Sequence, residues 1–272
     1  MMTISDKQNC IKAAFEILKK SNTQSFPIKI SPIMHYFQDQ YGVSFVKYSV
    51  LARENNTSVA GIGLVYNSTD AALRYNPQTG ETCIVYNDEH PRARQQWSIA
   101  HELAHFFFKH HLIKYNAEAA GLSLSKDTQA KQESEANFFP RILMAPIDVV
   151  LYFMGGYQAY KEYEVFTLLR SMFHLSQDAS YYYAISLLGN GKTLRFLTNP
   201  EIANYFEPYC HQIMREFDSA VFRALTRRYE EEYFRTRAAM DQKASGIYRP
   251  RYMESSDEVI RRVLPFPNDN WA

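Results

Sequence analysis

Two histidines spaced four residues apart are the residues of this chain best suited to binding a metal ion. His101 and His105 lie in the run WSIAHELAHFFF, which contains no helix-breaking residue. Because four residues turn an α-helix by about one revolution, both imidazoles project from one face, one turn apart. At this spacing two ring nitrogens can reach one zinc ion at ~2.0–2.1 Å. The pattern therefore predicts a helix that supplies two zinc ligands.

The residue after the first histidine is a carboxylate placed to act on water near that metal. Glu102 lies about 100° round the helix from His101, which keeps it off the metal and near the open coordination position. Zinc lowers the pKa of a bound water to about 7, and a carboxylate can then take the proton. The hydroxide formed can attack a carbonyl carbon. The segment thus predicts metal-assisted hydrolysis, with Glu102 as the catalytic base.

A third ligand is expected from a downstream helix, and the best candidate is the segment 131–139, KQESEANFF. Glu133 and Asn137 are four residues apart and share a helical face, on which the small Ala136 allows another helix to approach closely. Glu133 is the predicted third ligand, and Asn137 is predicted to orient a ligand histidine through its other ring nitrogen. Glu135 is turned about 200° from Glu133, so we expect a solvated surface charge there.

Two more histidines follow the motif closely, at positions 110 and 111. His110 lies nine residues after His101, near the same helical stripe. A continuous helix would carry it more than ~13 Å away, which is too far to share the metal. We therefore expect His110 to be a surface residue or a residue that supports a ligand.

Helical and extended runs surround these residues. Apolar residues at helical spacing predict a helix over 5–20, and Ser31-Pro32 opens a second one that ends near Gly42. Four extended runs separated by turn-forming residues then predict a small antiparallel sheet: Val43–Leu51, Ser58–Tyr66, Ala71–Tyr75 and Thr82–Tyr86. The last run is predicted to be an edge strand that binds substrate in extended form. From Pro91 onward the pattern is almost wholly helical.

Glycine pairs suggest how the chain is divided. Gly155-Gly156 and Gly189–Gly191 predict three parts: an α+β metal-binding domain over 1–155, a helical segment over 156–191 packed on it, and a helical C-terminal region over 192–272. Within the last part, a short extended run at 193–197 precedes a long helix over about 200–240. The tail beyond residue 245 has little periodicity, so we expect an extended or partner-bound arm.

Composition excludes several classes of protein. Hydrophobic residues make up 46% of the 272 positions and aromatic residues 15%, which is too apolar for a disordered chain. The formal net charge is +1, so no global field favours nucleic acid or an anionic membrane. Three cysteines at unpatterned spacing argue against a disulfide framework. With no signal-peptide core and no apolar run of membrane-spanning length, a cytoplasmic location is expected.

These residues together resemble the ImmA/IrrE family of bacterial metallopeptidases. The family pattern is a basic stretch, a short apolar run, HELxH, then ExEAN and a Leu-Met-Pro-like ending. The matching stretches here are RARQQWSIAHELAH at 92–105, ESEAN at 133–137 and LMAP at 143–146. The resemblance covers about residues 25–190, including 173–179, which look like the family's helix-turn-helix-like segment. Pro140 stands where the family usually has alanine, and we expect it to end or kink the ligand helix.

The resemblance implies both a fold and an activity. The fold would be α+β: a zincin-like domain with a small N-terminal antiparallel sheet and active-site helices, followed by a helical C-terminal region. One zinc ion per chain would be held by two histidines and a glutamate, here His101, His105 and Glu133. The activity would be that of an intracellular endopeptidase whose protein substrate is a DNA-binding transcriptional repressor, which would make this chain an antirepressor protease.

Two other readings compete with the peptidase. In the first, a metal-binding regulatory or toxin-antitoxin component acts by protein contact without proteolysis, although such a site would not need Glu102. In the second, the chain is a DNA-binding regulator. Residues 174–190 contain no Lys or Arg, and basic residues in 200–272 are balanced by acidic ones, so direct nucleic-acid binding is not expected.

Overall fold

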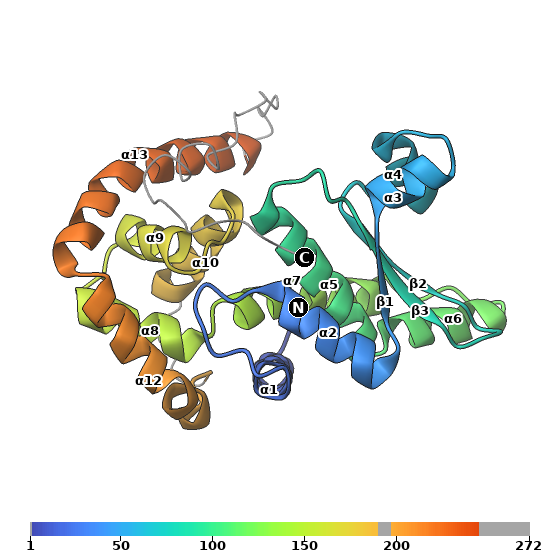
Figure 1. Cartoon of the computed structure of the whole chain (residues 1–272), viewed down its shortest axis with the longest axis horizontal. Helices are drawn as coiled ribbons and strands as arrows, with labels where there is room; N and C mark the ends of the chain where they lie inside the picture. The colour runs from blue at the N-terminus through green and yellow to red at the C-terminus, as the bar shows by residue number, and fades with distance from the viewer. Residues whose placement is uncertain (1, 190–196, 245–272) are drawn as a thin grey trace. The chain divides into compact units, whose positions relative to one another are not determined.

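The computed structural model describes residues 2–189 and 197–244 (Figure 1). The first elements are α1 (Ile4–Lys20), α2 (Ile30–Tyr41), β1 (Ser44–Lys47), α3 (Tyr48–Glu54), α4 (Val59–Tyr66), β2 (Ala71–Tyr75), β3 (Thr82–Tyr86) and α5 (Arg92–Phe107). They are followed by α6 (His110–Ala119), α7 (Lys126–Met144), α8 (Ile147–Tyr157), α9 (Glu162–Ser171), α10 (Gln177–Gly189), α12 (Pro200–Glu216) and α13 (Ser219–Ala244). The fold class is α+β, as predicted.

The sheet has three strands in the order β1-β3-β2, and it is mixed. β2 pairs with β3 antiparallel, with Leu73 opposite Ile84, while β1 pairs with β3 parallel, with Phe45 opposite the same Ile84. The prediction of a wholly antiparallel sheet is therefore wrong. The prediction that Thr82–Tyr86 is an edge strand is also wrong, because β3 lies between the other two strands.

The run Ser58–Tyr66, predicted as a strand, forms the helix α4, and the end of Val43–Leu51 forms α3. The Ser58 hydroxyl caps α4 by accepting a hydrogen bond from the Gly61 N–H at 3.0 Å. Ile62 is buried in a small core with Tyr48, Ala52 and Val85. Helix capping and this packing outweigh the strand preference of the apolar residues in the run.

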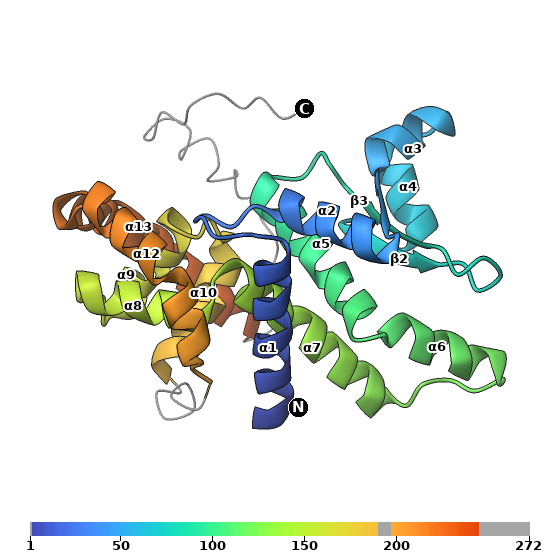
Figure 2. The same ribbon diagram turned by 60° about the horizontal axis from the view of Figure 1, so that its bottom comes forward.

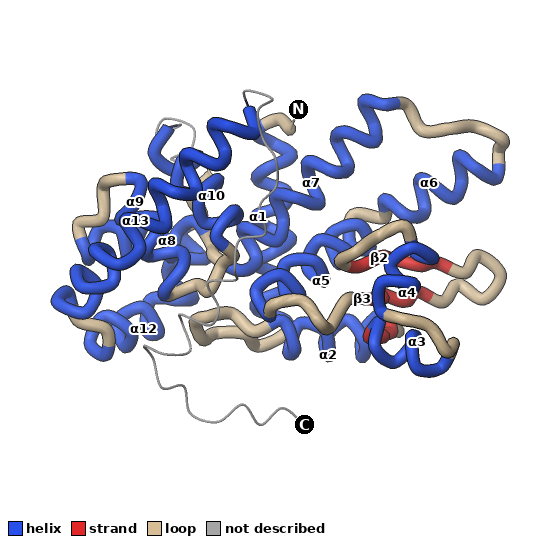
Figure 3. The backbone as a smooth tube through the Cα atoms, turned by 90° about the horizontal axis from the view of Figure 1, so that it is seen from above, coloured by secondary structure: helices blue, strands red, loops and turns tan. Residues whose placement is uncertain are grey.

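One helix connects the sheet to the rest of the fold. α5 packs on β2 and β3 and also on α7, which in turn packs on α1 (Figures 2 and 3). Leu103 of α5 and Phe139 of α7 are fully buried, as is Ile84 of the central strand. Ala100, Ala104 and Ala136 are also fully buried, and their small side chains allow the α5 and α7 backbones to approach closely. The candidate ligands therefore lie on two adjoining helices.

Pro140 does not end the predicted ligand helix. α7 begins with a Ser125 cap and continues through Pro140 to Met144, four residues further along. Pro140 itself is buried among the residues of the core. The helix ends instead where Pro146 precedes α8, and α7 and α8 are bent by 50°.

The C-terminal helices differ from the prediction at one point. The long helix expected over about 200–240 is broken into α12 and α13, because Asp218 accepts hydrogen bonds from the Ala220 and Val221 N–H groups and starts a new helix. Of the extended run predicted at 193–197, residues 193–196 lie outside the described residues, as does the tail from 245. Met1–Arg237 forms one compact unit, and the predicted boundary near 155 falls inside α8. The three-part division stays a prediction.

Among the helices of the described residues, no single one combines the length and apolar character that a membrane span requires. Only α7 and α8 taken together, bent as they are, reach the necessary length and composition.

Candidate metal centre

α5 presents its two motif histidines side by side. The Nε2 atoms of His101 and His105 are 3.1 Å apart, and both side chains are largely buried, with 20% and 16% of their surface exposed. The helical spacing predicted from the sequence is realised, because α5 is uninterrupted from Arg92 to Phe107. Each imidazole can therefore offer one ring nitrogen to the same ion.

α7 brings a carboxylate to the same point. The Oε2 and Oε1 atoms of Glu133 lie 3.7 Å from the Nε2 of His101 and 3.5 Å from the Nε2 of His105. Ligands arranged tetrahedrally at ~2.0–2.2 Å from zinc are separated by roughly 3.3–3.6 Å. The observed separations of 3.1–3.7 Å are close to this range, so small side-chain adjustments would let the three groups hold one tetrahedral ion. The Glu133 side chain is 58% exposed, so the group of donors is accessible to solvent from α7.

Burial keeps the two imidazoles in the form that binds metals. It lowers the pKa of His105 to about 3, an effect strengthened by the neighbouring His101 and His110. Burial also lowers the pKa of His101, against the opposing influence of the Glu133 carboxylate. Both rings are thus neutral at physiological pH, and neutral imidazole is the ligand form.

Asn137, the residue predicted to orient a ligand histidine, lies one turn after Glu133 on α7. The Asn137 side chain and the Ala136 backbone act on the His101 ring as hydrogen-bonding groups that raise its pKa against the effect of burial. If Nε2 of His101 binds the metal, Nδ1 is the nitrogen left for Asn137. Such a contact fixes the tautomer and the ring orientation of a ligand histidine.

Glu102 is held beside the donors by the sheet. Its Oε2 accepts a hydrogen bond from the Leu73 N–H of β2 at 2.8 Å. Burial raises the pKa of Glu102 to about 7, with a further increase from the Glu133 charge, while the Leu73 hydrogen bond opposes the rise. A carboxyl group with a pKa near the working pH is well matched to proton transfer.

His110 contacts a ligand histidine, which is one of the two alternatives expected for it, whereas the position of Glu135 differs from the prediction. α5 ends at Phe107 and Lys109 adopts a left-handed conformation (φ 60°), so the chain turns back and α6 starts at His110. The Nδ1 of His110 lies 3.1 Å from the Nδ1 of His105, and its Nε2 lies 3.0 Å from Glu135 Oε2. The predicted solvated position of Glu135 is wrong, because its side chain is only 16% exposed.

The two hydrogen bonds that link His105, His110 and Glu135 can be assigned donors and acceptors. If Nε2 of His105 faces the metal, its Nδ1–H donates to His110, and the Nε2–H of His110 donates to Glu135. Glu135 thus orients the predicted ligand His105 through the imidazole of His110. Residue spacing along one helix could not predict this hydrogen-bonded series, because it depends on the helix break at Lys109.

We predict that His110→Phe weakens zinc binding about 10- to 100-fold, the usual cost of losing a group that orients a metal ligand. The phenyl ring fills similar space but cannot accept the Nδ1–H of His105. His111→Phe is the matched control, because the His111 ring stacks on Phe106 and bonds only the backbone carbonyl of His105. Zinc affinities measured by competition with a chelating dye give the comparison. Equal affinities of the two variants would contradict the role of His110.

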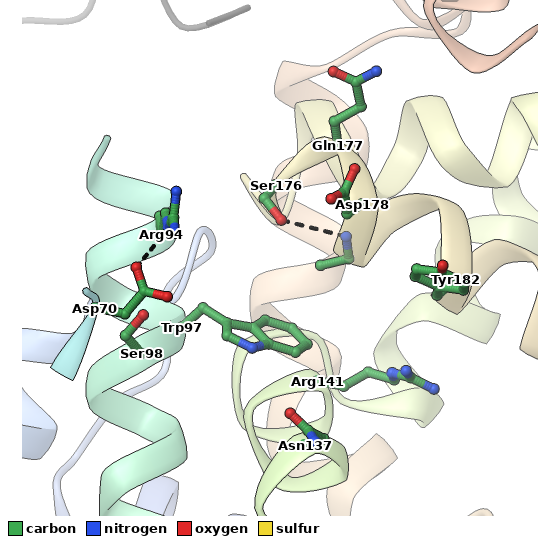
Figure 4. A pocket seen from close by; sticks show the side chains of 11 residues that line it. Asp70, Arg94, Trp97, Ser98, Asn137, Arg141, Ser176, Gln177, Asp178 and Tyr182 are labelled. Atoms are coloured by element: carbon green, nitrogen blue, oxygen red, sulfur yellow. Dashed lines mark hydrogen bonds and ion pairs between the residues drawn. The ribbon is translucent and has the colours of Figure 1, made fainter. Parts of the chain in front are cut away.

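A cavity of about 630 Å³ adjoins this centre (Figure 4). It lies between α5, α7 and the first turns of α10, and it reaches Asn137, the residue bonded to His101. The indole of Trp97 projects from α5 toward α10. The other lining residues are Asp70, Arg94, Ser98, Arg141, Ser176, Gln177, Asp178, Ala179 and Tyr182.

Comparison with known proteins gives one match. The sequence model of the family described as the IrrE N-terminal-like domain matches residues 61–180. That stretch runs from α4 to the first turn of α10 and contains all the candidate donors and Glu102. It also contains every residue that lines the cavity except Tyr182. No curated protein and no solved structure matches the chain.

Proposed function

We propose that this chain, whose residues 61–180 form a metallopeptidase domain of the ImmA/IrrE family, is a zinc-dependent endopeptidase. The proposed ligands of one zinc ion per chain are His101, His105 and Glu133. The observation that carries the proposal is the spacing of their donor atoms, 3.1–3.7 Å, which is close to that of three ligands around a tetrahedral ion and leaves a fourth position for water or substrate. An open position distinguishes a catalytic site from a closed structural one.

The proposed catalytic base is Glu102. When bound, a zinc ion supplies Lewis acidity that lowers the pKa of water to about 7 and polarises a carbonyl oxygen. Glu102, fixed by the Leu73 N–H, accepts the proton of the attacking water and passes it to the departing amine. Asn137 and His110 keep the two histidine rings oriented during this cycle.

The substrate is proposed to pair with the free edge of β2, in place of the edge expected at Thr82–Tyr86. Strand alternation directs the N–H and C=O groups of Ala71, Leu73 and Tyr75 away from β3. The Ser68 hydroxyl already bonds both groups of Ala71, and the Leu73 N–H donates to Glu102. The edge from the Leu73 carbonyl to Tyr75 is therefore the stretch on which an extended peptide can add beside the donors.

The proposed protein substrate is a DNA-binding transcriptional repressor. This part of the proposal is supported by the family resemblance of the HELAH and ESEAN segments, and it goes beyond what the domain match alone implies. A helix-rich repressor would have to present a locally extended segment, because only an extended chain can pair with β2.

The test combines metal analysis with a cleavage assay. Protein purified without chelators is expected to contain close to one zinc ion per chain, and co-incubation with a repressor encoded by a neighbouring gene is expected to give two fragments. His101→Ala should remove both the metal and the cleavage. Zinc-free wild-type protein would overturn the proposed cofactor. An intact repressor that still binds the zinc-loaded chain would favour the non-proteolytic regulator.

A further inference from the structure

The cavity beside the candidate metal centre contains two arginines in different electrostatic settings. The guanidinium of Arg94 lies 2.7 Å from the carboxylate of Asp70, so that charge is already neutralised (Figure 4). Arg141, which follows Asn137 by one turn of α7, has no carboxylate within ion-pair distance among the described residues. Only one of the two cations in the cavity therefore has an anionic partner.

The surroundings of Arg141 leave part of its hydrogen-bonding capacity unused. Its Nη1 makes a long contact of 3.5 Å to the Ser186 hydroxyl, and its guanidinium lies 5.4 Å from the centre of the Tyr183 ring. Its Nε is buried and has no hydrogen-bond partner in the part of the chain described here. Burial also lowers the pKa of the guanidinium. A planar donor group held this way is suited to a carboxylate, which can bond two of its N–H groups at once.

The other walls of the cavity fit a side chain that ends in such a group. Trp97 supplies an apolar surface for methylene carbons. The first turn of α10 adds the positive end of a helix dipole, partly offset by Asp178, which forms no ion pair with Arg141. An acidic or carboxyl-terminal residue would thus have apolar contact and a paired charge in the same cavity.

The direction of β2 places this cavity relative to the scissile bond. β2 starts after Asp70, which lines the cavity, and ends at Tyr75, whose ring contacts His111 and Tyr115 of α6. A peptide that adds antiparallel to β2 therefore runs from α6 toward the cavity. The cavity then receives residues on the C-terminal side of the scissile bond.

The distance along α7 indicates which residue reaches Arg141. Glu133 and Arg141 are eight residues apart, or about 12 Å along the helix axis. An extended peptide advances about 3.3 Å per residue, and the long arginine side chain shortens the remaining gap. For a peptide that runs alongside α7, the residue two or three positions after the scissile bond is the one within reach.

We propose that this cavity is a specificity site in which Arg141 pairs with a substrate carboxylate two or three residues C-terminal of the scissile bond. The inference rests on the proposed peptidase function and adds a substrate class to it. The carboxylate comes either from an Asp or Glu side chain or from the free C-terminus of a short substrate. Both sources offer the same group to Arg141, so the experiment separates them.

The test uses random-sequence peptides of eight residues with acetylated N-termini, in two libraries whose C-termini are either free or amidated. Zinc-loaded wild-type protein is incubated with each library, and mass spectrometry identifies the products. Enrichment of Asp and Glu at the second or third residue after the cut in the amidated library indicates the side-chain source. Cuts two or three residues before a free C-terminus, lost on amidation, indicate the terminal carboxylate.

The variants assign the preference to Arg141. Arg141→Gln should reduce kcat/KM for the preferred peptides by about 10- to 100-fold, the worth of hydrogen bonds to a charged group, and leave uncharged peptides unaffected. Arg141→Lys should restore part of the preference. The control is Arg53→Gln, which removes an exposed arginine of α3 that does not line the cavity and should keep the preference.

A binding measurement separates this inference from the proposed peptidase function. Fluorescence anisotropy with Glu102→Gln protein should show tighter binding of a carboxylate peptide than of its amide analogue, and Arg141→Gln in that background should remove the difference. This result would support the carboxylate site even if no peptide were cut. A preference that survives Arg141→Gln, or an acidic preference on the N-terminal side of the cut, would overturn the proposal.

Discussion

Replacing Glu102 with glutamine should slow peptide hydrolysis by about 10²–10⁴-fold while the fold and the metal content stay the same. The amide has nearly the same shape and can still accept the Leu73 N–H hydrogen bond through its carbonyl oxygen. It cannot accept a proton from the attacking water. Rates of cleavage under single-turnover conditions, with zinc measured on the same samples, check this prediction.

Glu118→Gln is a suitable control, since Glu118 is an exposed carboxylate on the nearby helix α6. It should leave the rate unchanged. Cleavage by Glu102→Gln at the wild-type rate would remove Glu102 as the base. Loss of both zinc and activity would instead mean that Glu102 takes part in holding the metal.

The helices around the site could be predicted from local patterns. The metal-binding spacing at His101 and His105 requires only that α5 be continuous, and Gly42 ends α2 in the left-handed conformation that glycine readily adopts. The bounds of β2 and β3 also follow from the turn residues on either side. These features depend on residues within a few positions of one another, which is the information a single sequence carries most directly.

The pairing of the strands could not be predicted in this way. β1 and β3 are parallel partners about forty residues apart, and no local pattern specifies that contact. As a result β3 lies in the middle of the sheet, and Val85 is buried in a core with Tyr48 and Ile62. A proline at Val85, which would test an edge strand, would here disrupt the central strand. Substitutions in β2 are the better test of where an extended substrate pairs with the sheet.

The residues that support the metal ligands also differ in how well local sequence patterns predict their positions. Asn137 could be predicted because it is one turn from Glu133 on the same helix. For His110 the sequence left open a surface residue or a residue that supports a ligand, because nothing in the residues 107–110 breaks a helix strongly. The turn at Lys109 that brings His110 back to His105 is accompanied by packing of the Phe108 ring against Phe139 and His110. Tertiary contacts of this kind override local preference, and they also reverse the prediction for Glu135.

The largest loss of zinc affinity among the acidic and amide residues of α7 is expected for Glu133→Ala. Only this side chain brings oxygen atoms within 3.5–3.7 Å of both histidine Nε2 atoms. Asn137→Ala and Glu135→Ala should each cost about 10- to 100-fold, because Asn137 orients His101 directly and Glu135 orients His105 through His110. The sequence alone predicted a solvated Glu135 with little influence on zinc. The structure instead predicts similar losses of zinc affinity for Glu135→Ala and Asn137→Ala.

Zinc titrations of the three variants, with circular dichroism to confirm the fold, give the ranking. Glu135→Gln adds a sharper comparison, since its amide can still accept from His110 but carries no charge to strengthen that hydrogen bond. It should fall between wild type and Glu135→Ala. If Glu135→Ala lost more affinity than Glu133→Ala, the carboxylate on the metal would be Glu135, and α7 would have to rotate to bring it there. If the zinc affinity of Glu135→Ala equalled that of wild type, the hydrogen bonds from His105 through His110 to Glu135 would contribute only to packing.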